Sequence, residues 1–211
     1  PINTMSEAAI NYSATLIGEG ESPIGKLEIR TDDELERLCE SLKHMERDII
    51  SSSSQLAIAD WNSSHDSMTQ MYNKRAYEEQ LVKLESEREV GIVYLDIDNL
   101  KRMNDTYGHE NGDKVIINAA EMIKKYLNAD VTSYRVGGDE FVVLVSSYTK
   151  EAFDKMVEMM KADEAGTLSD PADEFFCRLA IGGAYREEKE TLQDTIKRAE
   201  SMMYQNKHTV R

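Results

Sequence analysis

The sequence predicts an α+β domain with an antiparallel central sheet over residues 64–211, and two observations support this prediction. Short apolar runs typical of buried strands alternate with longer segments in which apolar residues recur every three or four positions. Two of the apolar runs, TSYRV and FVVLV, are separated only by GGDE, which is typical of a hairpin. The order strand, helix, strand, strand, helix, strand is that of the ferredoxin-like or polymerase-palm arrangement (βαββαβ), and we expect its helices to cover one face of the sheet.

The predicted elements of this domain run from residue 90 to the last helix. Strands are expected at residues 90–98, 132–136, 141–145 and 175–185, and helices at residues 114–127, 150–162 and 191–207. The run FVVLV is apolar at every position, so we expect its strand to be buried on both faces. The strand that begins at Val90 is apolar enough to be central, and it ends in Asp96-Ile97-Asp98.

The N-terminal part contains two short heptad patterns that predict helices. The apolar positions are Ile2, Met5, Ala9, Tyr12 and Leu16 in the first pattern, and Leu35, Leu38, Leu42, Met45 and Ile49 in the second. The Gly- and Pro-containing stretch between them, residues 18–33, is not expected to be helical. Two such helices cannot bury their apolar stripes as a pair, so we expect a parallel homodimer.

The stretch that follows, residues 49–63, is ambiguous. Leu56 and Ala59 continue the heptad, but the run of serines makes a poor coiled-coil core. The sequence allows either a flexible linker or a signalling helix of marginal stability.

Composition limits the classes of function. The chain has 211 residues, a formal net charge of -15 and 40% hydrophobic residues. This charge argues against a sequence-independent binder of nucleic-acid polymers, which needs a basic face. A small anionic ligand stays compatible with it, because a bound cation can reverse the field inside one site. No apolar run approaches the roughly 20 residues of a membrane span.

Three acidic residues are expected to meet at one edge of the sheet. In a palm topology the end of the first strand, with Asp96, lies beside the hairpin tip that carries Asp139 and Glu140. Clustered carboxylates repel one another unless one takes up a proton or a divalent cation binds between them. We expect Gly137 and Gly138 to permit positive φ angles and the approach of a phosphate. These features predict a magnesium site for phosphoryl or nucleotidyl chemistry.

The segment after the first strand supplies candidate nucleotide contacts. Lys101 is a candidate for contacting phosphate. Asn104 and Asp113 combine an amide with a carboxylate, which suits guanine because its N1 and N2 atoms are donors.

Together, these motifs resemble the GGDEF domain of diguanylate cyclases. The matching segments are SMTQMYNKRAY at 67–77, DIDNLKRMNDTYGHENGD at 96–113, GGDEF at 137–141, and the late AIGGAY and RAESMMYQNK. The resemblance covers residues 64–211. It implies an enzyme that condenses two GTP molecules into cyclic di-GMP and releases two pyrophosphates, with one half-site in each domain of a dimer.

The resemblance also implies roles for individual residues. The magnesium ion, with manganese as an alternative, is expected to be held by Asp96, the backbone carbonyl of Ile97, and Asp139. Glu140 is expected either at the metal or in activating the attacking 3'-hydroxyl. The implied substrate contacts are the guanine-binding Asn104 and Asp113 with His109 in the same loop, and the phosphate-binding Lys101, Lys207 and Arg211.

Residues 1–48 resemble a HAMP module, in which DELERLCESLKHM matches the second helix. This implies a HAMP-like dimerisation and signalling module at 1–48, a helical signalling linker at 49–63 and the catalytic domain at 64–211. The parent protein would then be a bacterial-type membrane receptor, attached through a segment that precedes Pro1, with this chain as its cytoplasmic portion. Movement of the helices would bring the two catalytic domains into or out of register.

One of the departures from the family pattern bears on regulation, and two alternative functions remain. Where many members carry an inhibitory RxxD motif, this chain has Asn128 and Val131, so we expect no strong product inhibition through that position. The main alternative is a catalytically silent GTP-binding or dimerisation module. No acid of the motifs is lost, which favours the enzyme, and the guanine-reading pair disfavours another palm-type nucleotidyl cyclase.

Overall fold

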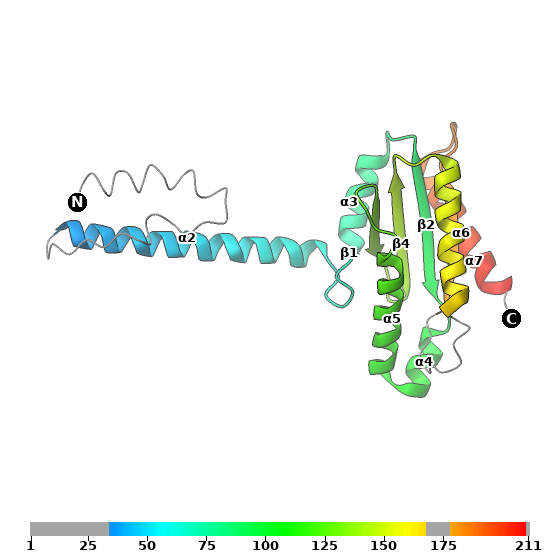
Figure 1. Ribbon diagram of the computed structural model, residues 1–211, viewed down its shortest axis with the longest axis horizontal. Helices are drawn as coiled ribbons and strands as arrows, with labels where there is room; N and C mark the ends of the chain where they lie inside the picture. The colour runs from blue at the N-terminus through cyan, green and yellow to red at the C-terminus, as the bar shows by residue number, and fades with distance from the viewer. Residues whose placement is uncertain (1–33, 168–177, 210–211) are drawn as a thin grey trace. The chain divides into compact units, whose positions relative to one another are not determined.

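The computed structural model describes residues 34–167 and 178–209 of the chain (Figure 1). The chain divides into two compact units, residues 1–61 and 62–211, and each is described by itself. The first predicted heptad helix and the connector after it lie outside the described residues.

Helix α2, Glu34–Ser64, is the described part of the N-terminal region. It includes the second heptad and continues through the serine-rich stretch without a break. Residues 49–63 are therefore helical, and the flexible-linker alternative is wrong for this structure. The heptad side chains of Leu38, Met45, Ile49 and Leu56 are exposed on the helix, as expected for an apolar stripe that no element of the described residues covers.

The second unit is built on a five-stranded sheet with the order β1-β3-β4-β2-β5. The strands are β1 (Tyr72–Asn73), β2 (Val90–Ile97), β3 (Val131–Arg135), β4 (Glu140–Ser146) and β5 (Leu179–Tyr185). Only the short pairing of β1 with β3 is parallel, and the other neighbours are antiparallel. The predicted central position of β2 and the predicted β3–β4 hairpin are confirmed.

Helices cover both faces of this sheet, so the expectation that they cover one face is wrong. The helices are α3 (Lys74–Leu84), α4 (Leu100–Tyr107), α5 (His109–Lys124), α6 (Lys150–Thr167) and α7 (Leu192–Thr209). Helices α5 and α6 lie in front of the sheet in Figure 1, and residues of α3 and α7 form a core on the other face.

The burial of β2 explains this two-sided cover. Val93 and Leu95 belong to the core with α5 and α6, whereas Val90 and Ile92 belong to the core with α3 and α7. All four side chains are fully buried. Successive strand residues point to opposite faces, so a strand that is apolar at nearly every position needs cover on both sides.

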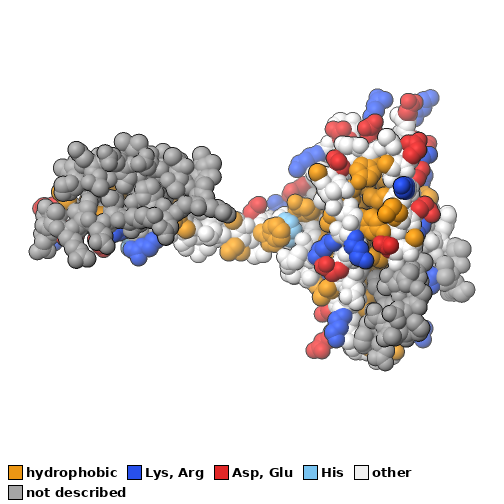
Figure 2. Space-filling view, viewed as in Figure 1, with side chains coloured by type: hydrophobic (Ala, Val, Ile, Leu, Met, Phe, Trp, Pro, Cys, Tyr) orange, Lys and Arg blue, Asp and Glu red, His pale blue; other side chains and the backbone are white. Residues whose placement is uncertain are grey.

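The face that carries α5 and α6 shows basic and acidic side chains interspersed around exposed apolar groups (Figure 2). No continuous basic surface is visible on the described part of this face. Among residues 34–167 and 178–209, no helix is long and apolar enough to cross a membrane.

Candidate active site

The sheet brings three predicted site residues, Asp96, Asp139 and Glu140, together at one end of its central strands β2 and β4. We call this end of the sheet the carboxylate edge. Asp96, near the end of β2, lies directly opposite Glu140, the first residue of β4. The backbone N–H of Ile97 donates to the backbone carbonyl of Asp139 at 3.0 Å, which holds the hairpin turn against the end of β2. The predicted neighbourhood of Asp96, Asp139 and Glu140 is therefore present, and the metal-binding roles remain predictions.

The two glycines of the turn do not have the positive φ angles that we expected. Neither Gly137 nor Gly138 has a positive φ, and Gly108 is the described glycine that does. A Cβ at Gly137 would lie 2.5 Å from Oε2 of Glu140, so the missing side chain leaves room for that carboxylate. A Cβ at Gly138 would meet nothing within 4 Å, and this side of the turn is open to a ligand.

Burial and like charge both act on the carboxylates. Burial raises the pKa of Asp96, the charges of Asp139 and Asp98 act in the same direction, and the contact with Lys207 opposes them. Burial, followed by the charges of Asp139 and Asp96, raises the pKa of Glu140. The edge therefore has an excess of negative charge that a cation would relieve.

Lys207 of α7 is the cation that the chain itself places there. Its Nζ lies 2.5 Å from Oδ1 of Asp96. Burial alone lowers the pKa of Lys207, but the hydrogen bond to Asp96 and the charges of Asp98 and Asp139 outweigh it, and the pKa is raised. Lys207 was expected to contact phosphate, and in this structure it is the counter-ion of the predicted metal ligand.

Two arginines that the sequence reasoning missed hold this edge in place. Arg135, at the end of β3, donates from Nη2 to the carbonyl of Gly138 at 2.8 Å and from Nη1 to Oδ1 of Asp66 at 3.0 Å. Arg178 forms an ion pair with Asp98, with 3.5 Å between Nε and Oδ2. The position of Arg135 two residues before GGDEF was the available signal for the first contact.

The predicted guanine contacts lie on α4 and α5. A Cβ at Gly112 would fall 1.8 Å from Oδ1 of Asn104, so Gly112 leaves space for that amide. This oxygen is buried and accepts no hydrogen bond from the described residues, which suits an acceptor reserved for a ligand. Asp113 lies on the surface of α5, one residue after Gly112.

The remaining predicted substrate contacts are not all brought together. Lys101 on α4 and His109 at the start of α5 are exposed, and neither has a described hydrogen bond with the carboxylates. Arg211 lies outside the described residues. Of the predicted substrate contacts, the structure gives a defined neighbour to two. Asn104 lies beside Gly112, and Lys207 contacts Asp96.

The donor set at the edge fits a hard divalent ion. In the part of the chain that is described, no group of three or more His, Cys, Asp and Glu side chains is arranged to hold a metal. The predicted set of Asp96, Asp139 and one backbone carbonyl is smaller and contains only oxygen. Magnesium is commonly held by one or two carboxylates and completes its shell with water and substrate phosphates.

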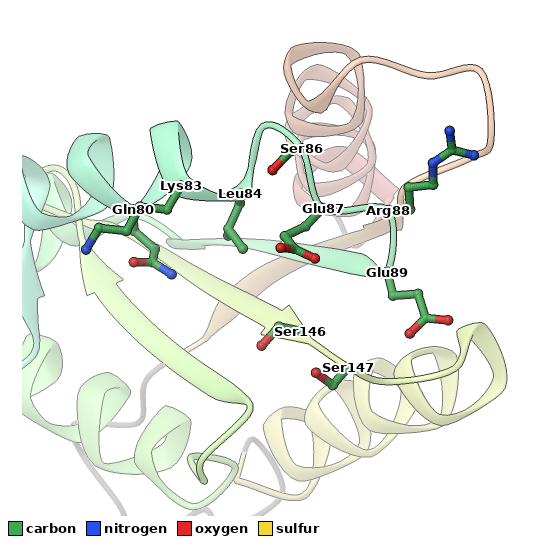
Figure 3. Close-up of a pocket in the computed structure, with 9 residues that line it drawn as sticks. All are labelled: Gln80, Lys83, Leu84, Ser86, Glu87, Arg88, Glu89, Ser146 and Ser147. Atoms are coloured by element: carbon green, nitrogen blue, oxygen red, sulfur yellow. The ribbon is translucent and has the colours of Figure 1, made fainter.

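A separate hollow of about 750 Å³ lies at the other end of the sheet (Figure 3). It is lined by the last turns of α3, by residues 86–89 before β2, and by Ser146 at the end of β4 with Ser147 after it. Val90 pairs with Ser146 there. Its charged residues are Lys83, Arg88, Glu87 and Glu89. Their charges balance and the carboxylate edge is remote, so this hollow is not the candidate active site.

Acidic residues at the meeting point of β2 and the β3–β4 hairpin, on a sheet of this order, define a palm-type domain. A family model described as "Diguanylate cyclase, GGDEF domain" matches residues 63–211. The chain belongs to this family.

Curated relatives agree with that membership. The chain is 28% identical over 159 residues to diguanylate cyclase VdcA of Vibrio cholerae, which covers 73% of this chain and 47% of VdcA. It is 31% identical over 147 residues to the probable diguanylate cyclase DgcJ of Escherichia coli, covering 67% of this chain and 29% of DgcJ. It is also 37% identical over 94 residues to the cyclic di-GMP phosphodiesterase PdeR of Escherichia coli, covering 43% and 14%. The chain spans half or less of each relative's length.

Solved structures show the same fold. The coiled coil and GGDEF domain of DgcB from Caulobacter crescentus, in complex with c-di-GMP, matches 85% of this chain and 97% of that chain. The TM-score is 0.69 and the sequence identity is 23%. The predicted α+β fold, with a helix preceding the domain, is confirmed.

Proposed function

We propose that this chain is a diguanylate cyclase that converts two GTP molecules into cyclic di-GMP and two pyrophosphates. The observation that carries the proposal is the pairing of Asp96 with Glu140 across β2 and β4, with Asp139 tied to the same strand end. Membership of the family and the similarity to the diguanylate cyclase VdcA support it.

Each residue of the edge has a part in the proposed reaction. Asp96, the carbonyl of Ile97, and Asp139 hold the divalent ion, and Glu140 either joins them or accepts the proton of the attacking 3'-hydroxyl. When bound, the ion neutralises charge at the α-phosphate and lowers the pKa of that hydroxyl. The new bond joins the 3'-oxygen to the α-phosphorus, and the bond to the leaving pyrophosphate breaks.

The nucleotide is held by the other two sets of residues. Asn104 and Asp113 bind the guanine edge, and the unpartnered Oδ1 of Asn104 supports this assignment. Lys101, Lys207 and Arg211 neutralise the phosphates, and His109 lies at the start of α5, between the two base contacts in sequence. Most of the rate enhancement then comes from positioning and charge stabilisation.

One such domain binds one GTP, so product formation requires two domains that face each other. We propose a homodimer joined through the N-terminal helices. The exposed apolar stripe of α2 supports this, because Leu38, Met45 and Leu56 have no cover within the described chain. The HAMP-like nature of residues 1–48, gating by that module and attachment to a membrane receptor belong to the same proposal, and they rest on sequence resemblance alone.

A silent nucleotide-binding module is the second candidate. The observation in its favour is the similarity to PdeR, a cyclic di-GMP phosphodiesterase rather than a cyclase. Retention of all the acids at the β2 edge favours the cyclase.

The test is to incubate the chain with GTP and magnesium and to separate the products by chromatography. We expect cyclic di-GMP from the wild type and none from Asp139→Asn. Asp154→Asn is a matched control because Asp154 is exposed on α6, away from the carboxylate edge. Magnesium-dependent GTP binding without any product, at protein concentrations where the chain is dimeric, would establish the silent module instead.

A further inference from the structure

Helix α7 is attached to strand β5 along its length. In its first half, Nη2 of Arg198 donates to the carbonyl of Tyr185 at 2.6 Å. In the middle, a Cβ at Gly182 would lie 2.0 Å from the backbone N of Met203 and 2.3 Å from the carbonyl oxygen of Ala199. Backbone therefore meets backbone at Gly182, and the helix cannot be shifted toward the strand there.

The third attachment, near the end of α7, is made by Asn206. Its Oδ1 accepts a hydrogen bond from the backbone N–H of Ile181 at 3.1 Å. Strand β5 is an edge strand, paired only with β2 in the described sheet, so Asn206 occupies a donor that has no neighbouring strand to bond. This side chain fixes the last turns of α7 against β5.

Lys207 follows Asn206 directly and reaches across to β2. Its ammonium contacts Asp96, and Asp96 pairs with Ala180, the neighbour of Ile181 on β5. The two successive side chains of α7 thus bind adjacent positions of two neighbouring strands. The hydrogen bond of Asn206 fixes the position of the Lys207 backbone, and therefore the distance of the Lys207 side chain from Asp96.

We propose that Asn206 is a positioning residue that holds Lys207 on Asp96 as a counter-ion, so that a divalent ion binds well only together with a nucleotide. This inference rests on the proposed function. An ammonium in contact with Asp96 competes with a metal ion for the same carboxylate. The phosphates of an incoming nucleotide offer Lys207 another anionic partner and release Asp96 to the metal. By linkage, metal and nucleotide then raise each other's affinity by the same factor.

The experiment measures Mn²⁺ binding to the whole 211-residue chain without nucleotide, by electron paramagnetic resonance of the free ion. We expect Lys207→Gln to bind Mn²⁺ about tenfold more tightly than the wild type, because the competing charge is gone. Asn206→Ala should also gain affinity, by a few-fold, since Lys207 is retained but no longer held. The double variant should match Lys207→Gln, and Ser201→Ala, an exposed site on α7, should match the wild type.

The direction of the change separates positioning from mere damage to the fold. Loss of a structural contact alone would leave Mn²⁺ affinity unchanged or reduce it, whereas the proposal requires a gain. The proposal is overturned if Lys207→Gln gains nothing, or if it gains affinity while Asn206→Ala does not. Cyclic di-GMP formation is assayed on the same samples, so failure of the cyclase assignment shows separately as absence of product despite the predicted order of Mn²⁺ affinities.

Discussion

Gly112 illustrates how one missing side chain shapes the proposed base pocket. The amide of Asn104 occupies the space that a Cβ would take, and its Oδ1 stays free of hydrogen bonds from the described residues. We predict that Gly112→Ala displaces this amide and raises the KM for GTP by about tenfold or more, the cost of a lost hydrogen bond to a ligand. Mn²⁺ affinity without nucleotide should be unchanged.

The control for this prediction is Asn118→Ala, an exposed residue of the same helix. Steady-state kinetics measure the KM for GTP of both variants, and Asn118→Ala should match the wild type. An unchanged KM in folded Gly112→Ala would mean that Asn104 does not bind the base.

Glu190 carries a prediction about pH and stability. The carboxylate of Glu190 accepts hydrogen bonds from Nε and Nη2 of Arg198, at 3.0 and 2.7 Å. The hydroxyl of Thr195 also donates to it, at 3.0 Å. The hydrogen bonds from Arg198 are the main cause that lowers the pKa of Glu190 from 4.5 to about 2. Because the folded-state pKa lies below the unfolded one, this stabilisation is complete above about pH 4.5 and disappears as the pH falls toward 2.

We therefore predict that Glu190→Gln lowers the free energy of unfolding by about 1–2 kcal/mol at pH 7. The difference from the wild type should shrink steadily below pH 4.5. Urea unfolding at several pH values measures it, and a difference that stays constant down to pH 3 would contradict the role given to the charge.

At the scale of elements, the strands were the most predictable part. Their apolar runs and the GGDE turn are local signals, and β2, the β3–β4 hairpin and β5 appear where they were expected. Strand β1 has only two residues, Tyr72 and Asn73, and is defined by their pairing with β3. A strand this short has no pattern of its own in the sequence, so it was not predicted. The cover on both faces was readable from β2, where Val90 and Val93 are both apolar but point to opposite sides.

The site was predictable to the extent that strand register determines it. Asp96 and Glu140 meet because two central strands pair, and topology alone placed them together. The contacts of Lys207 and Asn206 depend on how α7 docks on β5, which is set by the backbone approach at Gly182. Such long-range contacts have no periodic signature in the sequence.

The hairpin that carries the acids is fastened to the segment before β1 by Arg135. This arginine is largely buried and bonds both Asp66 and the carbonyl of Gly138. We predict that Arg135→Gln lowers the free energy of unfolding by about 1–3 kcal/mol, because a buried charge-assisted contact is lost. Cyclase activity should fall more than stability explains, since the turn with Asp139 is no longer held.

Arg75 provides the comparison for this prediction. It forms an exposed i,i+4 pair with Glu79, with side chains 67% and 58% exposed, so Arg75→Gln should change stability by less than about 0.5 kcal/mol. Equal effects of the two substitutions in urea unfolding would remove the special role of Arg135.

For the whole molecule, we predict no strong inhibition by product bound outside the active site. Asn128, at the position of the missing inhibitory arginine, is used internally: its Nδ2 donates to the hydroxyl of Tyr148 at 3.0 Å and its Oδ1 accepts from the N–H of Asp130 at 2.9 Å. Val131 is buried in β3. Calorimetric titration with cyclic di-GMP should detect no tight site in Asp139→Asn, and tight binding there would contradict this expectation.

The central claim is that two copies of the carboxylate edge act together on two GTP molecules. It is tested most directly by mixing wild type with Asp139→Asn at constant total protein, allowing subunits to exchange, and measuring the rate of cyclic di-GMP formation. If both half-sites must be competent, the rate falls as the square of the wild-type fraction, and an equimolar mixture keeps about a quarter of the rate. A linear fall, with about half the rate retained, would show that one edge suffices and would contradict the account.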